Sequence, residues 1–333
     1  MHAGSLRCSV VVPVHNGARY LCNCLQALER QSVPRDSYEV IVVWDGDADD
    51  HQQLGQWPGV RWLQQAHQGP AAARNLGTAS AHGEMVLFTD ADCEPAPDWV
   101  SLMLTPFGDS RVSGVKGVYA TNQQSLVARF AQLEYEDKYR RMVGRETIDF
   151  IDTYSAGYRR RILQSAGGFD TRFPTASVED QELSFRLAKA GHRLVFQQTA
   201  VVFHQHPATL WAYVRRKFRI GYWKVLVHRR HPDKLISDSH TPQVLKLQML
   251  LLAMLLPAVG VSMAVARWWL VLGVALALTC SMAPFCVWAW RRDRGVALIA
   301  PMLLVTRSLA LGLGFATGLI GQSIRGRRVP HVA

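Results

Sequence analysis

Apolar and polar positions alternate in two different ways along this chain, and the pattern changes near residue 206. In the first part, short apolar runs alternate with segments of helical periodicity. The runs that predict buried strands are residues 9–14, 39–44 and 85–89, and the segments that predict helices are about 18–30, 70–81 and 98–104. This repeat predicts an α/β, Rossmann-like domain whose mostly parallel sheet has helices on both faces.

Three later apolar stretches reach the length of about 20 residues that a membrane-crossing helix needs. They are residues 247–266, 268–290 and 296–320, of which the second is bounded by Trp268 and Trp290, as interfacial belts are. The third carries Arg307 near its middle, where a charged side chain costs about 3 kcal/mol unless it faces protein or water. We therefore expect residues 241–333 to form a membrane region with two to three helices.

The course of the third apolar stretch is open. If the first two stretches form a hairpin, the basic residues of 215–234 and 291–294 lie on the inner side of the membrane. A third crossing then places Arg325, Arg327 and Arg328 outside, against the usual excess of positive charge inside. The alternatives are a full crossing, which we favour, and a segment that is interfacial or re-entrant.

The charge of the chain is concentrated in its second part. The formal net charge is +11, and residues 215–333 contain 17 Lys and Arg against three Asp. Because this charge flanks apolar runs, it indicates membrane lipids as a partner and argues against nucleic acid. Within residues 207–240, aromatic side chains such as Trp211 and Trp223 are interleaved with cations such as Arg215, which predicts a helical linker in the headgroup layer.

Polar side chains follow each predicted strand directly. His15 and Asn16 follow the first strand, Asp45 follows the second, and Asp90 and Asp92 follow the third. Open α/β sheets bind ligands beyond the carboxyl ends of their strands, so we expect these groups to converge on one edge. Two carboxylates at such an edge repel each other unless a divalent cation lies between them, and oxygen ligands select Mg²⁺ or Mn²⁺. Because Mg²⁺ favours sites completed by phosphate oxygens, the expected ligand is a nucleoside diphosphate.

Simpler explanations exist for several of these residues. An Asp after a strand also fills a turn or caps a helix, and Asp180 also suits the N-terminus of an amphipathic helix, where the macrodipole favours an acid. His204 and His206 close a strand-like run, and because alternate strand residues share a face, both imidazoles can meet one metal. A polar strand end before Pro207 explains the two histidines equally well.

Five ordered segments carry a family resemblance. SVVVPVHNGARYLCNCLQAL, VVWDGDADD, QGPAAARNLG, FTDADCEP and GGFDTRFPTASVEDQELSFRLAKAGHRL together cover nearly all of residues 8–206. In order and spacing they resemble the family 2 glycosyltransferases of the GT-A fold. The resemblance implies that residues 1–206 form a catalytic domain that transfers a sugar from a nucleotide-sugar donor with inversion, assisted by Mg²⁺ or Mn²⁺.

The resemblance also implies roles for residues at matching positions. The implied nucleotide-binding residues are Pro13, His15, Asn16, Asp45, Arg74 and Asp90. Asp90 and Asp92 match the DxD pair, with Asp92 as the more direct metal ligand, and either His204 or His206 is expected to complete the metal shell. Glu179-Asp180 matches the catalytic ED pair, in which the Asp is the base.

This sequence departs from the family pattern at several places, among them Ser155, where many relatives carry Asn. Trp44 stands where relatives carry the first Asp of DDGS, and the QxxRW signature of processive synthases is absent. We therefore expect one sugar to be added per encounter, with Arg219, near the place of that signature, as a candidate for binding the diphosphate.

Together these features predict an integral protein of the cell (inner) membrane with its catalytic domain on the cytoplasmic face. The acceptor is expected to be lipid-linked or membrane-proximal, in glycolipid or cell-envelope polysaccharide synthesis. The alternatives are a catalytically silent membrane scaffold of a glycan-assembly complex and a nucleotidyltransferase.

Overall fold

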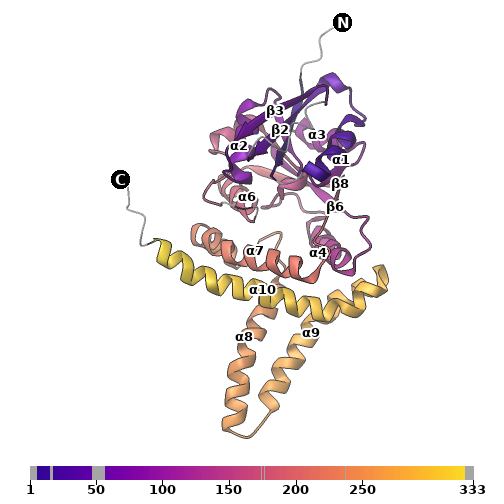
Figure 1. Ribbon diagram of the computed structural model, residues 1–333. Coiled ribbons are helices and arrows are strands. Elements are labelled where there is room, and N and C mark those ends of the chain that lie inside the picture. The colour runs from indigo at the N-terminus through magenta and orange to yellow at the C-terminus, as the bar shows by residue number, and fades with distance from the viewer. Residues whose placement is uncertain are drawn as a thin grey trace. The chain divides into compact units, whose positions relative to one another are not determined.

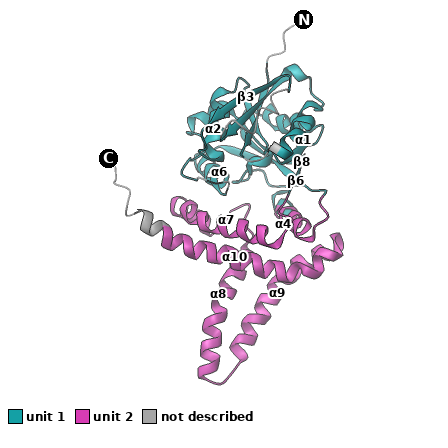
Figure 2. Cartoon of the chain, in the orientation of Figure 1, with its two compact units in different colours: residues 1–122, 139–205 teal, residues 123–138, 206–333 magenta. Residues whose placement is uncertain are grey.

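The chain forms two compact units, which Figure 2 shows in different colours. The computed structural model describes residues 6–15, 18–46, 57–173, 175, 177–236 and 238–326. The first unit comprises residues 1–122 and 139–205, and the second comprises residues 123–138 and 206–333. The boundary near residue 206 coincides with the change of sequence pattern, whereas the assignment of residues 123–138 to the second unit has no counterpart in that pattern.

The first unit is built on one mixed, eight-stranded sheet with the strand order β3-β2-β1-β4-β7-β6-β8-β5. Its strands are β1 (Cys8–Val14), β2 (Tyr38–Asp45), β3 (Val60–Gln65), β4 (Met85–Phe88), β5 (Cys93–Pro95), β6 (Val112–Ala120), β7 (Ala156–Arg159) and β8 (Arg193–His204). The pairs β3-β2, β2-β1, β1-β4 and β6-β8 are parallel. The short strands β7 and β5 pair antiparallel with their neighbours.

The apolar runs of the sequence become the buried centre of this sheet because both of its faces are covered. On one face, Val11 and Val43 pack against helix α2, where the hydrogen of Gly77 leaves room for both side chains. The alternate residues, such as Val10 and Val42, are also fully buried, so they face a second layer. Continuous Val and Ile runs therefore form the central strands, as the sequence predicts.

Helices connect the strands of the first unit. They are α1 (Ala18–Glu29), α2 (Pro70–Ser80), α3 (Trp99–Leu104), α5 (Arg160–Ser165) and α6 (Glu179–Lys189), with short 3₁₀ turns at Arg35–Ser37, Thr105–Gly108 and Thr153–Ser155. The order of parallel strands and helices confirms the α/β expectation for this part of the chain (Figure 1). Helix α4 (Leu126–Met142) begins in the second unit and ends in the first.

The rest of the second unit is helical. It contains α7 (Leu210–Arg230), the 3₁₀ turn Pro232–Leu235, α8 (Gln243–Ala264), α9 (Trp269–Arg292) and α10 (Arg294–Gly326). By length and composition α8, α9 and α10 are long and apolar enough to cross a membrane. Their apolar core gathers residues of α4, α7, α9 and α10, including Phe130, Tyr213, Met282 and Leu303. The expected interfacial segment and the three apolar stretches all form helices.

Candidate active site

The predicted polar residues lie at the carboxyl ends of three adjacent parallel strands. His15 follows β1, Asp45 is the last residue of β2, and Asp90 begins the turn after β4. Because β2, β1 and β4 are neighbours and run in the same direction, these ends meet at one edge of the sheet. The sequence-based expectation that the polar strand ends converge therefore agrees with the topology. Pro13 is the penultimate residue of β1, and Asn16 lies outside the described residues.

Asp45 anchors the loop that follows β3. Its buried carboxylate accepts hydrogen bonds from the Gln65 side chain, the Gln68 and Gly69 backbone N–H groups and Nδ1 of His67, all at 2.8–2.9 Å. Burial opposes ionisation, but the hydrogen bonds and the neighbouring His67 outweigh it, so the pKa of Asp45 lies below its ordinary value. Both carboxylate oxygens are used twice, which identifies Asp45 as the residue that shapes this loop.

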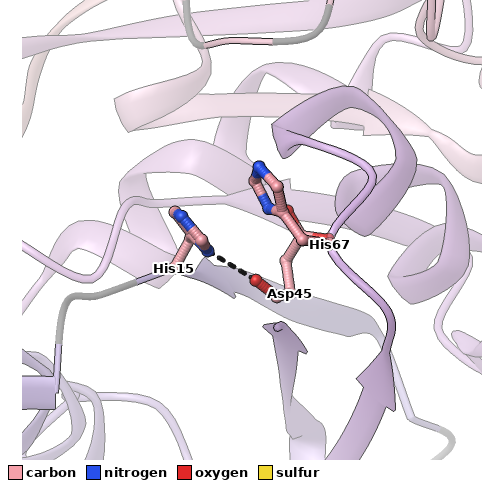
Figure 3. Close-up of side chains that lie close together, drawn as sticks. All are labelled: His15, Asp45 and His67. Atoms are coloured by element: carbon pink, nitrogen blue, oxygen red, sulfur yellow. Dashed lines mark hydrogen bonds and ion pairs between the residues drawn. The ribbon is translucent and has the colours of Figure 1, made fainter. Parts of the chain in front are cut away.

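Two imidazoles stack beside this carboxylate. The rings of His15 and His67 are 4.0 Å apart between centroids with an interplanar angle of 21°. Nδ1 of His15 lies 2.6 Å from the backbone oxygen of Asp45, and Nδ1 of His67 lies 2.9 Å from its Oδ2. Figure 3 shows the two rings next to each other at the end of β2. His67 was not among the residues predicted from the sequence, and the arrangement adds it to the expected nucleoside pocket.

Arg74 connects the sheet edge to helix α6. Its Nη2 lies 2.9 Å from Oδ1 of Asp90 and its Nη1 lies 2.9 Å from Oε1 of Glu179, with both Arg74 and Glu179 buried. Burial alone lowers the pKa of Arg74, but the two carboxylates raise it, so the guanidinium stays charged. Its Nε is buried and has no hydrogen-bond partner among the described residues. Arg74 thus positions the first Asp of the DxD pair and the Glu of the ED pair.

Asp180 differs from its neighbour Glu179. Glu179 is fixed by Arg74 and by the Ser177 backbone N–H at 2.8 Å, whereas Oδ1 of Asp180 accepts the N–H of Gln181 at 2.7 Å. Burial, together with the negative charge of Glu179, raises the pKa of Asp180 to about 7, and Arg74 only partly opposes this rise. A carboxylate with a pKa near neutrality suits a general base, because it accepts a proton more readily than an ordinary Asp.

Asp92 lies beside a histidine from the end of β8. Nε2 of His204 is 3.6 Å from Oδ2 of Asp92, because β5, which directly follows Asp92, pairs with the end of β8. Ligand atoms of Asp92, Cys93 and His204 lie within 4.8 Å of one another. Burial raises the pKa of the Cys93 thiol well above its usual range, so this sulfur stays protonated. The carboxylate oxygen of Asp92 is the kind of ligand that Mg²⁺ and Mn²⁺ prefer, whereas the neutral thiol is a poor ligand for either ion.

The remaining candidates belong to the second unit. β8 ends at His204, so the strand alternation that would pair both histidines does not extend to His206. Nε2 of His206 lies 3.0 Å from the Gln132 side chain, and its ring stacks on Tyr135. Burial and the charges of nearby cations lower the pKa of His206 to about 3, so this imidazole is neutral. Arg219 lies on an exposed part of α7.

A buried lysine in the first unit also escaped sequence analysis. Lys116 lies on β6, is fully buried, and forms an ion pair with Asp152 beside the rings of Phe150 and Tyr154. Burial lowers the pKa of Lys116 to about 7, and the charge of Asp180 works in the opposite direction. The signal available beforehand was a lysine at the centre of the apolar strand VSGVKGVYA, a residue that rarely occupies such a position without a partner.

Comparison with known proteins identifies the family of the first unit. Residues 9–167 match the family model described as glycosyl transferase family 2. The chain carries a family 2 glycosyltransferase domain. Curated relatives of this domain include the pre-mycofactocin glycosyltransferase of Mycobacterium tuberculosis, 30% identical over 68% of this chain and 48% of the relative. The glycosyltransferase AglE of Haloferax volcanii is 27% identical over 66% of this chain and 73% of its own length.

The fold of the family 2 domain also has solved counterparts. The chain is similar to a mannosyltransferase from Pyrobaculum calidifontis solved with GDP-Man and Mn²⁺, with a TM-score of 0.61 and 20% identity over 95% of this chain and 88% of that one. These findings confirm the expected GT-A fold followed by helices apolar enough for a membrane region. The chain spans about half the length of the mycobacterial relatives that it matches.

Proposed function

We propose that this chain transfers a sugar, with inversion, from a nucleotide-sugar donor to a hydroxyl of a lipid-linked or membrane-proximal acceptor. The observation that carries the proposal is a continuous series of charged groups from Asp90 through Arg74 to Glu179, ending at Asp180 with its pKa of about 7. This series links the end of β4, where a donor's phosphates are expected, to the carboxylate that would accept the acceptor's proton.

The reaction needs a base because a sugar hydroxyl is a weak nucleophile. Asp180 would accept the hydroxyl proton as the oxygen attacks the anomeric carbon, a role that contributes about 10²–10⁴-fold to the rate. Glu179 raises the pKa of this base, while the Glu179–Arg74 ion pair fixes the start of α6 and therefore the position of Asp180. Arg74 also holds Asp90 at the edge where the donor ribose is expected.

A divalent cation fits the donor side of this arrangement. Asp92 and His204 would hold Mg²⁺ or Mn²⁺, with Asp90 nearby. The cation would supply positive charge for the diphosphate that leaves. At the opposite side of the edge, His15 and His67 would bound the nucleobase, with the loop that carries His67 fixed by Asp45.

The apolar helices support the choice of acceptor. A chain whose second unit offers three helices apolar enough to enter a membrane concentrates its active domain at the membrane surface. That placement favours an acceptor held by the membrane over one free in solution. The basic α7 favours the face of the membrane that carries anionic lipids, and we place the catalytic domain on the cytoplasmic side of the inner membrane.

The experiment that tests the proposal compares Asp180→Asn with the parent chain on a panel of UDP-, GDP- and dTDP-sugars with Mn²⁺. Thermal stabilisation identifies the donor, and release of the nucleotide in the presence of membrane lipid extract measures turnover. We expect donor binding by Asp180→Asn to change little and turnover to fall at least about 100-fold. The matched control is Asp36→Asn, an exposed Asp on the 3₁₀ turn before β2, which should keep full activity.

Two results would contradict the proposal. Full turnover by Asp180→Asn would remove Asp180 from the role of base. Donor binding without transfer or donor hydrolysis by the parent chain would favour a membrane scaffold.

A further inference from the structure

Helices α7 and α10 are packed along each other by glycine contacts. The Cβ that a larger residue would place at Gly314 would strike the backbone oxygen of Phe218, and one at Gly318 would lie 2.5 Å from the backbone oxygen of Tyr222. From Gly314 to Gly318 the nearest atoms on α7 thus advance from Phe218 to Tyr222 and Val225, and a Cβ at Gly221 of α7 would be equally close to the backbone of Leu311. Because contacts advance together along both helices, α7 and α10 are parallel, and they run side by side in Figure 1.

A buried carboxylate forms ion pairs with both α7 and α10 and so holds the two helices together. Glu134 of α4 lies 3.0 Å from Nη1 of Arg307 on α10 and 2.9 Å from Nζ of Lys217 on α7, and it accepts the hydroxyl of Tyr213 at 2.8 Å. Arg307 also donates to the side chain of Gln248 on α8 at 2.8 Å. The charge at the middle of α10 is therefore neutralised inside the protein. It requires no aqueous path across a membrane.

The opposite side of α10 presents one apolar stripe. Its exposed large side chains are Leu298, Met302, Leu309, Leu313, Leu319 and Ile320. All but one recur at multiples of three or four residues, so from Leu298 to Ile320 they follow one face of the helix. The other face is buried on the unit, and half of the apolar window of α10 is buried. A helix with this division suits the plane of a membrane surface, with the stripe directed into the lipid.

Helices α8 and α9 present apolar side chains on nearly every side. Only 17% of the apolar window of α8 and 6% of that of α9 is buried. They form a hairpin that extends away from α7 and α10 at a steep angle to both helices, as Figure 1 shows. The length of α8 below α10 is measured from Gln248, which contacts Arg307. From Gln248 to Ala264 the helix rises by about 24 Å, and the depth of α10 in the membrane interface adds about 5 Å. The hairpin thus reaches the far side of a hydrocarbon core of about 30 Å, where Arg267, Trp268 and Trp269 form its exposed end.

We infer that, among the described helices, only the α8–α9 hairpin crosses the membrane and that α10 lies along the surface together with α7. Helix α7 cannot cross because it carries seven Lys and Arg, each of which is costly at mid-depth. Since α10 is parallel to α7 and in backbone contact with it, α10 takes the same direction. This inference replaces the crossing of α10 that hydropathy favours, and it removes the conflict that a third crossing would have with the usual excess of positive charge inside.

The arrangement is tested in the full chain by finding on which side of the membrane each of two introduced cysteines lies. A membrane-impermeant maleimide is applied to sealed vesicles of both orientations carrying either Ala266→Cys or a cysteine appended after Ala333, with the parent chain as the background. We expect the hairpin end and the C-terminus to react from opposite faces, the C-terminus from the face that also exposes an N-terminal tag. Reaction of both from one face would mean a third crossing, and an unreactive Ala266→Cys would mean that the hairpin does not cross. Either result overturns the inference.

A pair of lysine substitutions provides a second measurement that needs no accessible thiol. Leu256 of α8 is 81% exposed and lies near the middle of the hairpin, whereas Leu309 of α10 is 44% exposed and lies near the middle of its apolar stretch. Leu256→Lys should reduce the inserted fraction roughly 100-fold, the equivalent of about 3 kcal/mol. Leu309→Lys should be inserted within a few-fold of the parent, because its ammonium reaches the headgroups. Equal losses in both variants would show that α10 also crosses.

Discussion

Exchanging the charge of Asp180 for an amide should stabilise the protein in a pH-dependent way. The pKa of this group rises from 3.8 to about 7 on folding, so between these pH values the folded protein holds a proton that the unfolded chain has released. Stability from this group therefore falls as the pH rises from 4 to 7. At about 1.4 kcal/mol per unit, the loss amounts to about 4 kcal/mol above pH 7. Asparagine carries no charge, and its oxygen can still accept the N–H of Gln181.

The assay is thermal or denaturant unfolding of the full chain at pH 5, 6, 7 and 8. The stability advantage of Asp180→Asn over the parent should grow by about 2 kcal/mol between pH 5 and pH 7, where Asp180 is half ionised, and should level off by pH 8. Its matched comparison is Glu179→Gln, one residue earlier, which breaks a buried ion pair with Arg74 and should cost about 3–5 kcal/mol. An advantage of Asp180→Asn that does not change with pH would refute the reasoning. It would identify Asp180 as an ordinary ionised acid at a helix N-terminus.

Three further predictions concern other parts of the structure. His204→Ala should weaken Mn²⁺-dependent donor binding at least about 10-fold, measured by calorimetry, and should leave donor binding without metal unchanged. If the variant and the parent bind the donor equally well with Mn²⁺, His204 is not a metal ligand. Lys116→Met should move the acid limb of the kcat/KM profile to higher pH, because the ammonium favours ionised Asp180, and an unmoved limb would contradict this coupling. Gly314→Leu should lower the free energy of unfolding by about 1–3 kcal/mol, because the new side chain would clash with α7. The control Gly312→Leu should be tolerated, because its Cβ would lie 3.9 Å from its nearest neighbour. Equal effects of the two variants would argue against close packing of α7 and α10.

The central strands and the apolar helices were predictable because each is specified by a continuous stretch of sequence. β1, β2 and β4 are runs of Val, Ile and Leu buried on both faces, and parallel strands of this kind need no alternation. β3 and β6 were missed because they contain charged residues whose partners come from elsewhere in the chain. Arg61 of β3 pairs with Glu39 across the sheet, and Lys116 of β6 pairs with Asp152. Tertiary contacts outweighed local propensity there.

The sequence predicted which residues belong to the candidate site better than it predicted the contacts between them. The polar ends of the strands indicated His15, Asp45, Asp90 and Asp92 directly. The bridge made by Arg74 was not visible, because one of its partners lies 105 residues away on α6. His67 escaped for a related reason. Its loop is shaped by the carboxylate of Asp45, and no local pattern marks that contact.

The ion pair between Glu134 and Arg307 has a consequence for biosynthesis. The two residues are 173 positions apart, and Glu134 belongs to a helix that emerges from the ribosome between segments of the catalytic domain. Until α10 has been made, this carboxylate lacks one of its compensating cations. The second unit therefore completes its folding only after α10 has been translated, and a nascent protein arrested before residue 307 should be a preferred substrate for quality-control proteases.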